Sequence, residues 1–144
     1  MCDYCGCRSF TVIARFTAEH EDIVNAVGEL REAIESGAQE QAATAAAALA
    51  DLLGPHTRDE ERTLFAEMAQ DAEFSDHVDQ LCTEHRDLDE QLAALGTDDL
   101  DALRRFYDLL REHINKEENG LFPAAAIALD DAAWDRAQAL LDSP

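Results

Sequence analysis

Histidine and glutamate side chains occupy positions in this sequence where a helical bundle needs apolar ones. Apolar residues recur at alternating steps of about three and four along four segments, the pattern of amphipathic helices with one buried stripe. Each stripe also contains one histidine, and two stripes add a glutamate four residues later, on the same helix face. The six residues are His20, His56, Glu60, His85, His113 and Glu117. A polar group in a bundle core costs several kcal/mol unless something compensates it, so their convergence indicates a bound metal.

The same periodicity predicts the fold class. Four such helices joined by short connections predict an all-α protein, an antiparallel up-down four-helix bundle. We expect a short cysteine-bearing leader, residues 1–16, packed on the bundle end, and a bundle with a short C-terminal helix over residues 17–144. The predicted bundle helices cover about residues 17–36, 38–70, 74–95 and 97–119.

Local signals predict where the helices begin and end. Gly37 is expected to end the first helix. Thr97 is expected to cap the fourth helix, and Asp130 the C-terminal one. The pair Gly54-Pro55 is expected to kink the second helix or to restart it one residue before His56.

Counting residues outward from the predicted loops tests whether the six polar residues can meet. His20 and His56 each lie about eighteen residues from the first loop, near Ala38. His85 and His113 lie about thirteen and fifteen residues from the third loop. At about 1.5 Å of rise per residue, such mismatches stay within one helical turn. All six residues can therefore share one layer of the bundle.

The charge of the chain argues against two classes of partner. With 32 acidic and 11 basic residues, the formal net charge is −21. So acidic a chain is repelled by nucleic acid and by anionic membrane surfaces. No apolar run reaches the ~18 residues of a membrane span, and residues 1–16 lack the apolar region of a signal peptide. We expect a soluble, cytoplasmic protein.

The types of ligand narrow the choice of metal. Imidazole and carboxylate together in a bundle suit iron, manganese or zinc, and two glutamates with two oxygens each can bridge two ions. Ferritin-like carboxylate centres use Glu-x-x-His and mostly oxygen ligands. This chain has the reverse order, a longer spacing and more nitrogen, which points away from ferritin-like oxidation centres.

One sequence element, His-x-x-x-Glu-Glu-x-x-Leu-Phe, occurs twice, at residues 56–65 and 113–122. A second element, Glu-His-x-Asp followed by Ile or Leu, occurs at 19–23 and 84–88. These segments resemble the hemerythrin-like (HHE cation-binding) domain family. The resemblance implies a non-haem di-iron centre inside a four-helix bundle. It also implies that Glu60 and Glu117 bridge the two irons, with an oxo or hydroxo group between them.

One position departs from the oxygen-carrying members of that family. Those proteins have a fifth histidine four residues before the third-helix histidine, where this chain has Leu81. His77 lies about 12 Å from His85 along the helix axis, too far for the same ion, and we interpret it as a flank or surface residue.

The pattern is similar to the four-histidine di-iron proteins of nitric oxide stress and iron–sulfur repair. Two six-coordinate irons need roughly twelve bonds. The four histidines, the two bridging carboxylates and the oxo or hydroxo group would supply about ten of them, which leaves roughly two positions open, one on each ion.

The cysteines form a second candidate site. Cys2, Cys5 and Cys7 fall in the leader, and Cys82 lies three residues before His85. C-x-x-C-x-C in a reducing compartment is typical of a redox or metal-binding element. With Cys82, these residues could bind a further zinc or iron, or pass electrons to the centre as redox thiols. The alternatives are a disordered leader and a small apolar Cys82 in the core.

Three functions fit these features. The first is an oxidoreductase of stress defence that detoxifies nitric oxide, peroxide or O2 with electrons from a thiol or another donor. The second is a sensor or carrier that holds O2, nitric oxide or iron without turnover. The third is an iron donor for iron–sulfur cluster repair, with the leader cysteines handing over the iron. The open positions favour the first, and the small single domain favours the second.

Overall fold

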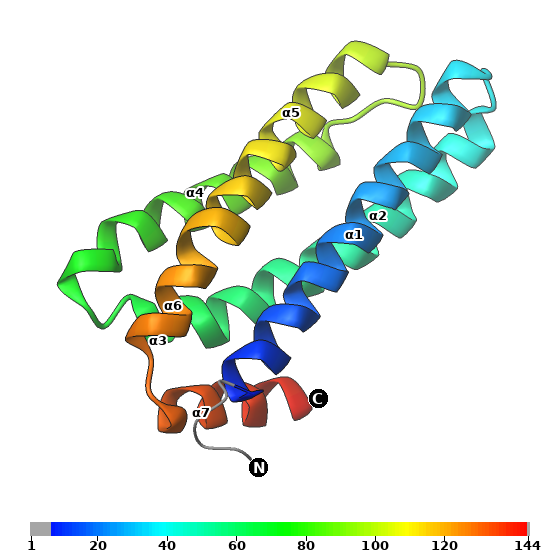
Figure 1. Cartoon of the computed structure of the whole chain (residues 1–144). Helices are drawn as coiled ribbons and strands as arrows, with labels where there is room; N and C mark the ends of the chain where they lie inside the picture. The colour runs from blue at the N-terminus through cyan, green and yellow to red at the C-terminus, as the bar shows by residue number, and fades with distance from the viewer. Residues whose placement is uncertain (1–6, 144) are drawn as a thin grey trace.

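The computed structural model describes residues 7–143, with side chains from residue 9 onward. All regular secondary structure in this range is helical, and the long helices form an elongated bundle (Figure 1). The prediction of an all-α bundle is therefore confirmed. α1 (Cys7–Glu35) packs along α2 (Gln39–Glu60), and α4 (Ala72–Ala93) packs along α5 (Leu100–Lys116). None of the described helices combines the length and the apolar character that a membrane crossing requires.

Two of the long helices continue through a π-helical turn. α2 passes into η1 (Glu61–Phe65) and then α3 (Ala66–Met68), and α5 passes into η2 (Glu117–Leu121) and then α6 (Phe122–Ala128). The last helix, α7 (Asp131–Asp142), lies across the end of the bundle beside the first turns of α1 (Figure 1). α7 therefore closes the end at which α1 begins.

The predicted helix ends are confirmed at two places and wrong at a third. Gly37 has a φ of 71°, the left-handed conformation that ends α1. The Asp130 carboxylate accepts the backbone N–H of Ala133 at 2.9 Å and caps α7. The fourth bundle helix is capped by Asp99, whose carboxylate accepts the N–H of Ala102 at 3.0 Å, and not by Thr97. A carboxylate is the stronger acceptor and also complements the helix dipole.

The predicted restart of the second helix at Pro55 is wrong, and the predicted kink stays a prediction. α2 runs without interruption from Gln39 to Glu60 with this proline inside it. Leu53 before the proline and His56 after it are both buried in the core. Tertiary packing of this stripe therefore outweighs the backbone hydrogen bond that a proline removes.

The sequence predicted that the first helix begins at about Thr17. In the structure it begins ten residues earlier, at Cys7. Val12 and Phe16 are fully buried, in one cluster with Trp134 of α7. Burial against α7 stabilises these early turns, and the periodicity of the segment alone does not reveal such a partner. Residues 7–16 therefore belong to the bundle. What remains of the predicted leader, residues 1–6, lies outside the described residues.

The apolar core is divided into two clusters. One contains Ile23 and Phe106 and extends toward the α1–α2 loop. The other contains Phe16 and Trp134 and lies at the end that α7 covers. Along α1, His20 lies between Phe16 of one cluster and Ile23 of the other. The layer that holds the histidines therefore separates the two clusters.

Trp134 is 2% exposed, whereas Leu140 on the same helix is 42% exposed. We expect Trp134→Ala to lower the free energy of unfolding by about 3–5 kcal/mol, because it leaves a cavity under α7. Leu140→Ala, the matched control, should change the free energy by no more than about 0.5 kcal/mol. Urea unfolding followed by circular dichroism measures both. A small effect of Trp134→Ala would mean that α7 does not support the bundle end.

Candidate metal centre

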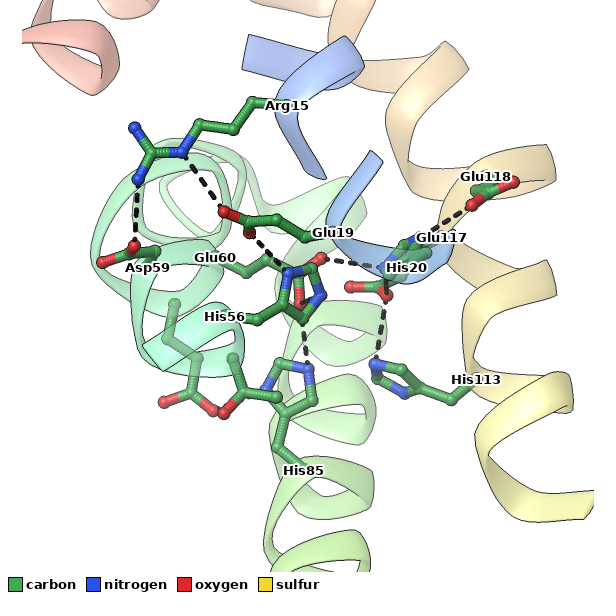
Figure 2. Close-up of polar contacts among 12 residues, drawn as sticks. Arg15, Glu19, His20, His56, Asp59, Glu60, His85, His113, Glu117 and Glu118 are labelled. Atoms are coloured by element: carbon green, nitrogen blue, oxygen red, sulfur yellow. Dashed lines mark hydrogen bonds and ion pairs between the residues drawn. The ribbon is translucent and has the colours of Figure 1, made fainter. Parts of the chain in front are cut away.

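The six polar residues that the sequence predicts as metal ligands come together in one buried layer. His20 lies on α1, His56 and Glu60 on α2, His85 on α4, His113 on α5, and Glu117 opens η2. Figure 2 shows their side chains converging from these separate helices. Each is between 0 and 4% exposed. We call these residues the six-residue cluster.

The cluster divides into two overlapping groups of four. One group consists of His20, His56, Glu60 and Glu117, and the other of His85, His113, Glu60 and Glu117. Within each group, one nitrogen or oxygen atom from every residue lies within 4.8 Å of the others. Both groups share both glutamates. The geometry therefore suits two ions, each held by its own pair of histidines, with the two carboxylates between them.

The inward-facing atoms of the cluster lack hydrogen-bond partners. Among the described residues, this holds for Nε2 of His20, His85 and His113 and for both carboxylate oxygens of Glu60 and Glu117. The closest approaches between these nitrogens and oxygens are 3.1–3.3 Å, but none has hydrogen-bond geometry. Buried polar atoms are rarely left without a partner. Nitrogen and carboxylate oxygen atoms that face each other in this way fit a metal pair, which would satisfy all of them.

The outward-facing nitrogen of every histidine is held by a different glutamate. The Nδ1 atoms of His20, His56, His85 and His113 lie 2.7–2.9 Å from carboxylate oxygens. Their respective partners, which we call the outer glutamates, are Glu118, Glu19, Glu61 and Glu84. A carboxylate in this position accepts the Nδ1–H, fixes the tautomer and leaves Nε2 free to bind a metal. Figure 2 shows two of these contacts, at His20 and at His56.

Each outer glutamate is the sequence neighbour of a cluster residue. Glu19 and Glu84 come directly before histidines, and Glu61 and Glu118 come directly after the cluster glutamates. Each long helix therefore supplies a histidine and also the carboxylate that holds a histidine of another helix. Sequence reasoning missed this role. The signal that could have revealed it is that each helix carries a glutamate directly beside a proposed ligand.

Cations reinforce two of the outer glutamates. Lys116, the one lysine in the chain, lies 2.5 Å from Glu84, and Arg15 lies 3.3 Å from Glu19. Burial alone would raise the pKa of Glu84, but hydrogen bonds from Lys116 and His113 lower it below its ordinary value. Glu84 therefore stays ionised and remains an acceptor for His113.

π-helical turns lie at both pairs of consecutive glutamates, Glu60-Glu61 and Glu117-Glu118. η1 begins directly after Glu60, and η2 begins at Glu117. π-turns insert an extra residue into a helix and occur often at functional sites. Beyond the turns, Phe65 stacks on His85 with ring centroids 5.3 Å apart, and Phe122 stacks on His20 at 5.9 Å. These rings shield the cluster from the side of the second apolar cluster.

The remaining candidate residues stay outside the six-residue cluster. Leu81 is fully buried, and His77 is half-buried and belongs to neither group of four. Cys82 is a free, half-buried thiol. Burial, and then the charge and hydrogen bond of Glu61, raise its pKa to about 11. The thiol is therefore protonated at neutral pH, a state that disfavours metal binding and nucleophilic chemistry.

The predicted cysteine site falls largely outside the part of the chain that the structure describes. Cys2 and Cys5 lie outside the described residues. Cys7 is the first residue of α1, but its side chain is also outside that description. A metal or redox function of these cysteines, with or without Cys82, stays a prediction.

In the absence of a metal, protons bind within the cluster. Burial alone would lower the pKa of His20, but the carboxylates of Glu117 and Glu60 raise it to about 10. Burial would also lower the pKa of His56, but the charge of Glu60 and a hydrogen bond with Glu19 raise it to about 9. Burial also disfavours the charged form of Glu60, but His56 and His20 hold its pKa well below the ordinary value. Imidazolium ions can therefore balance the two buried carboxylates.

Comparison with known proteins identifies one family. Residues 11–125 match the family model described as the hemerythrin HHE cation binding domain. This range contains the whole six-residue cluster and all four outer glutamates. No curated protein and no solved structure matches the chain in the corresponding comparisons.

The raised pKa values predict how the stability of the metal-free protein depends on pH. The pKa of His20 is about 10 and that of His56 about 9, against 6.5 for an ordinary histidine. Between about pH 6.5 and pH 10 the folded state binds more protons than the unfolded state. The free energy of unfolding therefore falls as the pH rises through this range. This contribution is fully present below about pH 6.5 and lost above about pH 10.

Urea unfolding of the metal-free protein across this pH range measures the effect. His77→Ala, a histidine outside the cluster, should leave the pH dependence unchanged, whereas His20→Gln should weaken it. A free energy that stays constant or increases over this range would contradict the assignment of protons to the cluster.

Proposed function

The chain belongs to the hemerythrin HHE cation-binding family, and from that membership and the geometry of the cluster we propose that it is a di-iron protein that reacts with small oxidants. Hemerythrin domains bind iron, and the buried histidines and glutamates fit a metal site. The proposed substrates are nitric oxide, peroxide and O2. The proposed role is detoxification of these molecules in stress defence.

The observation that carries the proposal is the sharing of two glutamates between two groups of ligands. His20 and His56 would hold one iron, His85 and His113 the other, and Glu60 and Glu117 would contact both. Among the described residues, no set of mutually close ligand atoms contains all four histidines, because each set joins one pair of histidines to the two glutamates. An iron pair supplies redox equivalents to a small ligand. The protein supplies the geometry, through the outer glutamates.

The surroundings of the cluster favour reaction with a small ligand over larger substrates. Phe65 and Phe122 stack on two of the histidines, and Phe16 lies edge-on to His56 with centroids 5.8 Å apart. These side chains exclude bulk water and leave no room for a bulky substrate at that side. Leu81, fully buried where a fifth histidine would stand, cannot ligate. Coordination positions therefore remain for small molecules.

The same burial weighs against iron donation to an acceptor protein. Every cluster residue is at most 4% exposed. Release of iron would therefore require the helices to separate, or at least the outer glutamates to let go of the histidines. Retention of the metal is the expected behaviour. Binding of O2 or nitric oxide without turnover remains the competing outcome, and steady-state consumption of nitric oxide or peroxide distinguishes the two.

Elemental analysis of the purified protein tests the iron pair. We expect about two irons per chain, because each group of four has the ligands for one ion. Replacing both Glu60 and Glu117 by alanine should remove most of the iron, since each carboxylate serves both positions. His77→Ala is the matched control and should retain full occupancy. Full iron content in the double variant would reject the shared-carboxylate assignment.

Leu81→His tests whether the missing fifth histidine matters for reactivity. The new imidazole would stand four residues before His85, on the same helix face. We expect it to occupy a position left for small ligands, so that consumption of nitric oxide or peroxide falls at least tenfold. Leu81→Gln introduces similar polarity without an imidazole and should keep more activity. Undiminished consumption in a histidine variant whose optical spectrum shows ligation would reject the mechanism.

A further inference from the structure

α1 and α5 lie next to each other in the bundle (Figure 1), and a groove runs between them on the outside. It consists of two hollows that share Val24. The upper hollow, of about 330 Å³, is lined by Val24, Val27, Gly28, Arg31, Leu103, Arg104, Tyr107 and Asp108. The lower hollow, of about 380 Å³, is lined by His20, Glu21, Val24, Asn25, Arg111, Ile114 and Glu118. We call them together the α1–α5 groove.

The floor of the upper hollow is apolar and open. Val27 and Leu103 belong to the buried core, and Tyr107 packs against the same cluster. A Cβ atom placed on Gly28 would meet no other atom within 4 Å. The helix backbone is therefore uncovered at this point, and the hollow has room for a flat group. Its volume falls within the range of small-molecule sites, about 300–1,000 Å³.

Three arginines line the groove, in a chain whose net charge is −21. Arg31 has no ion-pair partner among the residues that the structure describes. Arg104 pairs with Asp101 at 3.6 Å, but both side chains are more than half exposed, so the pair is weak. Arg111 donates a hydrogen bond to the Tyr107 hydroxyl at 3.0 Å. An arginine such as Arg31, without an ion pair among the described residues, is unexpected on so acidic a protein.

The carboxylates of the groove do not cancel this charge. Glu118 is committed to His20 at 2.7 Å. Glu21 and Asp108 line the two hollows but form no ion pair with the arginines. The lining of the upper hollow thus has two guanidinium groups against the one carboxylate of Asp108, and Asp101, which pairs weakly with Arg104, lies outside the lining. A ligand that complements the upper hollow therefore has an aromatic ring system and one negatively charged group.

We propose that the α1–α5 groove binds a small aromatic anion. The ring system lies on Val24, Gly28 and Tyr107, and the acidic group is held by Arg31 and Arg104. This site is distinct from the six-residue cluster, although the wall of the lower hollow includes His20 and Glu118. Because none of the residues of the upper hollow is a proposed metal ligand, binding does not depend on the proposed function.

The test uses the metal-loaded full-length protein and the fluorescent probe anilinonaphthalene sulfonate. We expect saturable binding of one probe per chain. The double variant Arg31→Gln/Arg104→Gln should weaken binding by at least about tenfold, the effect of losing charge-assisted contacts. Arg105→Gln is the matched control, because Arg105 is the neighbour of Arg104 but does not line the groove. It should bind the probe like the unchanged protein.

A second variant separates the groove from other apolar surfaces. Gly28→Leu fills the upper hollow and improves helix propensity, so it folds at least as well, and it should abolish probe binding. Displacement of the probe by naphthoate or by flavin mononucleotide supports the site and identifies a carboxylate or a phosphate as its preferred acid. The proposal is overturned if Gly28→Leu binds the probe normally, if neither competitor displaces it, or if a neutral dye binds the groove equally well.

Discussion

Burial of six ionisable side chains in one layer of a helical bundle is the constraint on which the rest of this structure depends. Such a layer divides the apolar core into two clusters, so no continuous hydrophobic core joins the two ends. The layer is tolerable only if every polar atom in it is satisfied. The outward nitrogens are satisfied by the outer glutamates. The inward atoms are the ones that a metal pair would satisfy, and a bound pair would then contribute to the folding energetics.

The outer glutamates connect the two helical hairpins in a closed circle. Glu19 of α1 holds His56 within the first hairpin, and Glu84 of α4 holds His113 within the second. The other two contacts cross between hairpins, from Glu61 of η1 to His85 and from Glu118 of η2 to His20. The glutamates that cross lie on the π-turns. A local departure from α-helical geometry therefore serves the long-range connection between the hairpins.

The sequence predicts the helices and the cluster well because both depend on one periodicity. An imidazole on an apolar stripe occupies a core position whatever the loops do, so the spacing alone placed His20, His56, His85 and His113 in one layer. The periodicity could not predict features that depend on contacts with another helix. The early turns of α1 exist because Trp134 covers them, and α2 passes through Pro55 because its flanks are buried. A π-turn changes the helical period, so a fixed period cannot reveal it.

Protons and metal compete for the same atoms of the cluster. In the metal-free protein, His20 and His56 have raised pKa values because the buried carboxylates attract a positive charge. A bound iron ion would supply the positive charge that protons supply in the metal-free protein. Its binding would therefore displace the protons from Nε2. The outer glutamates keep the Nδ1 side of each ring unchanged in both states, because a neutral and a protonated imidazole both donate from Nδ1. The outer glutamates therefore hold the ligand framework even without a metal, and a metal pair would take over the charge that protons carry at the centre.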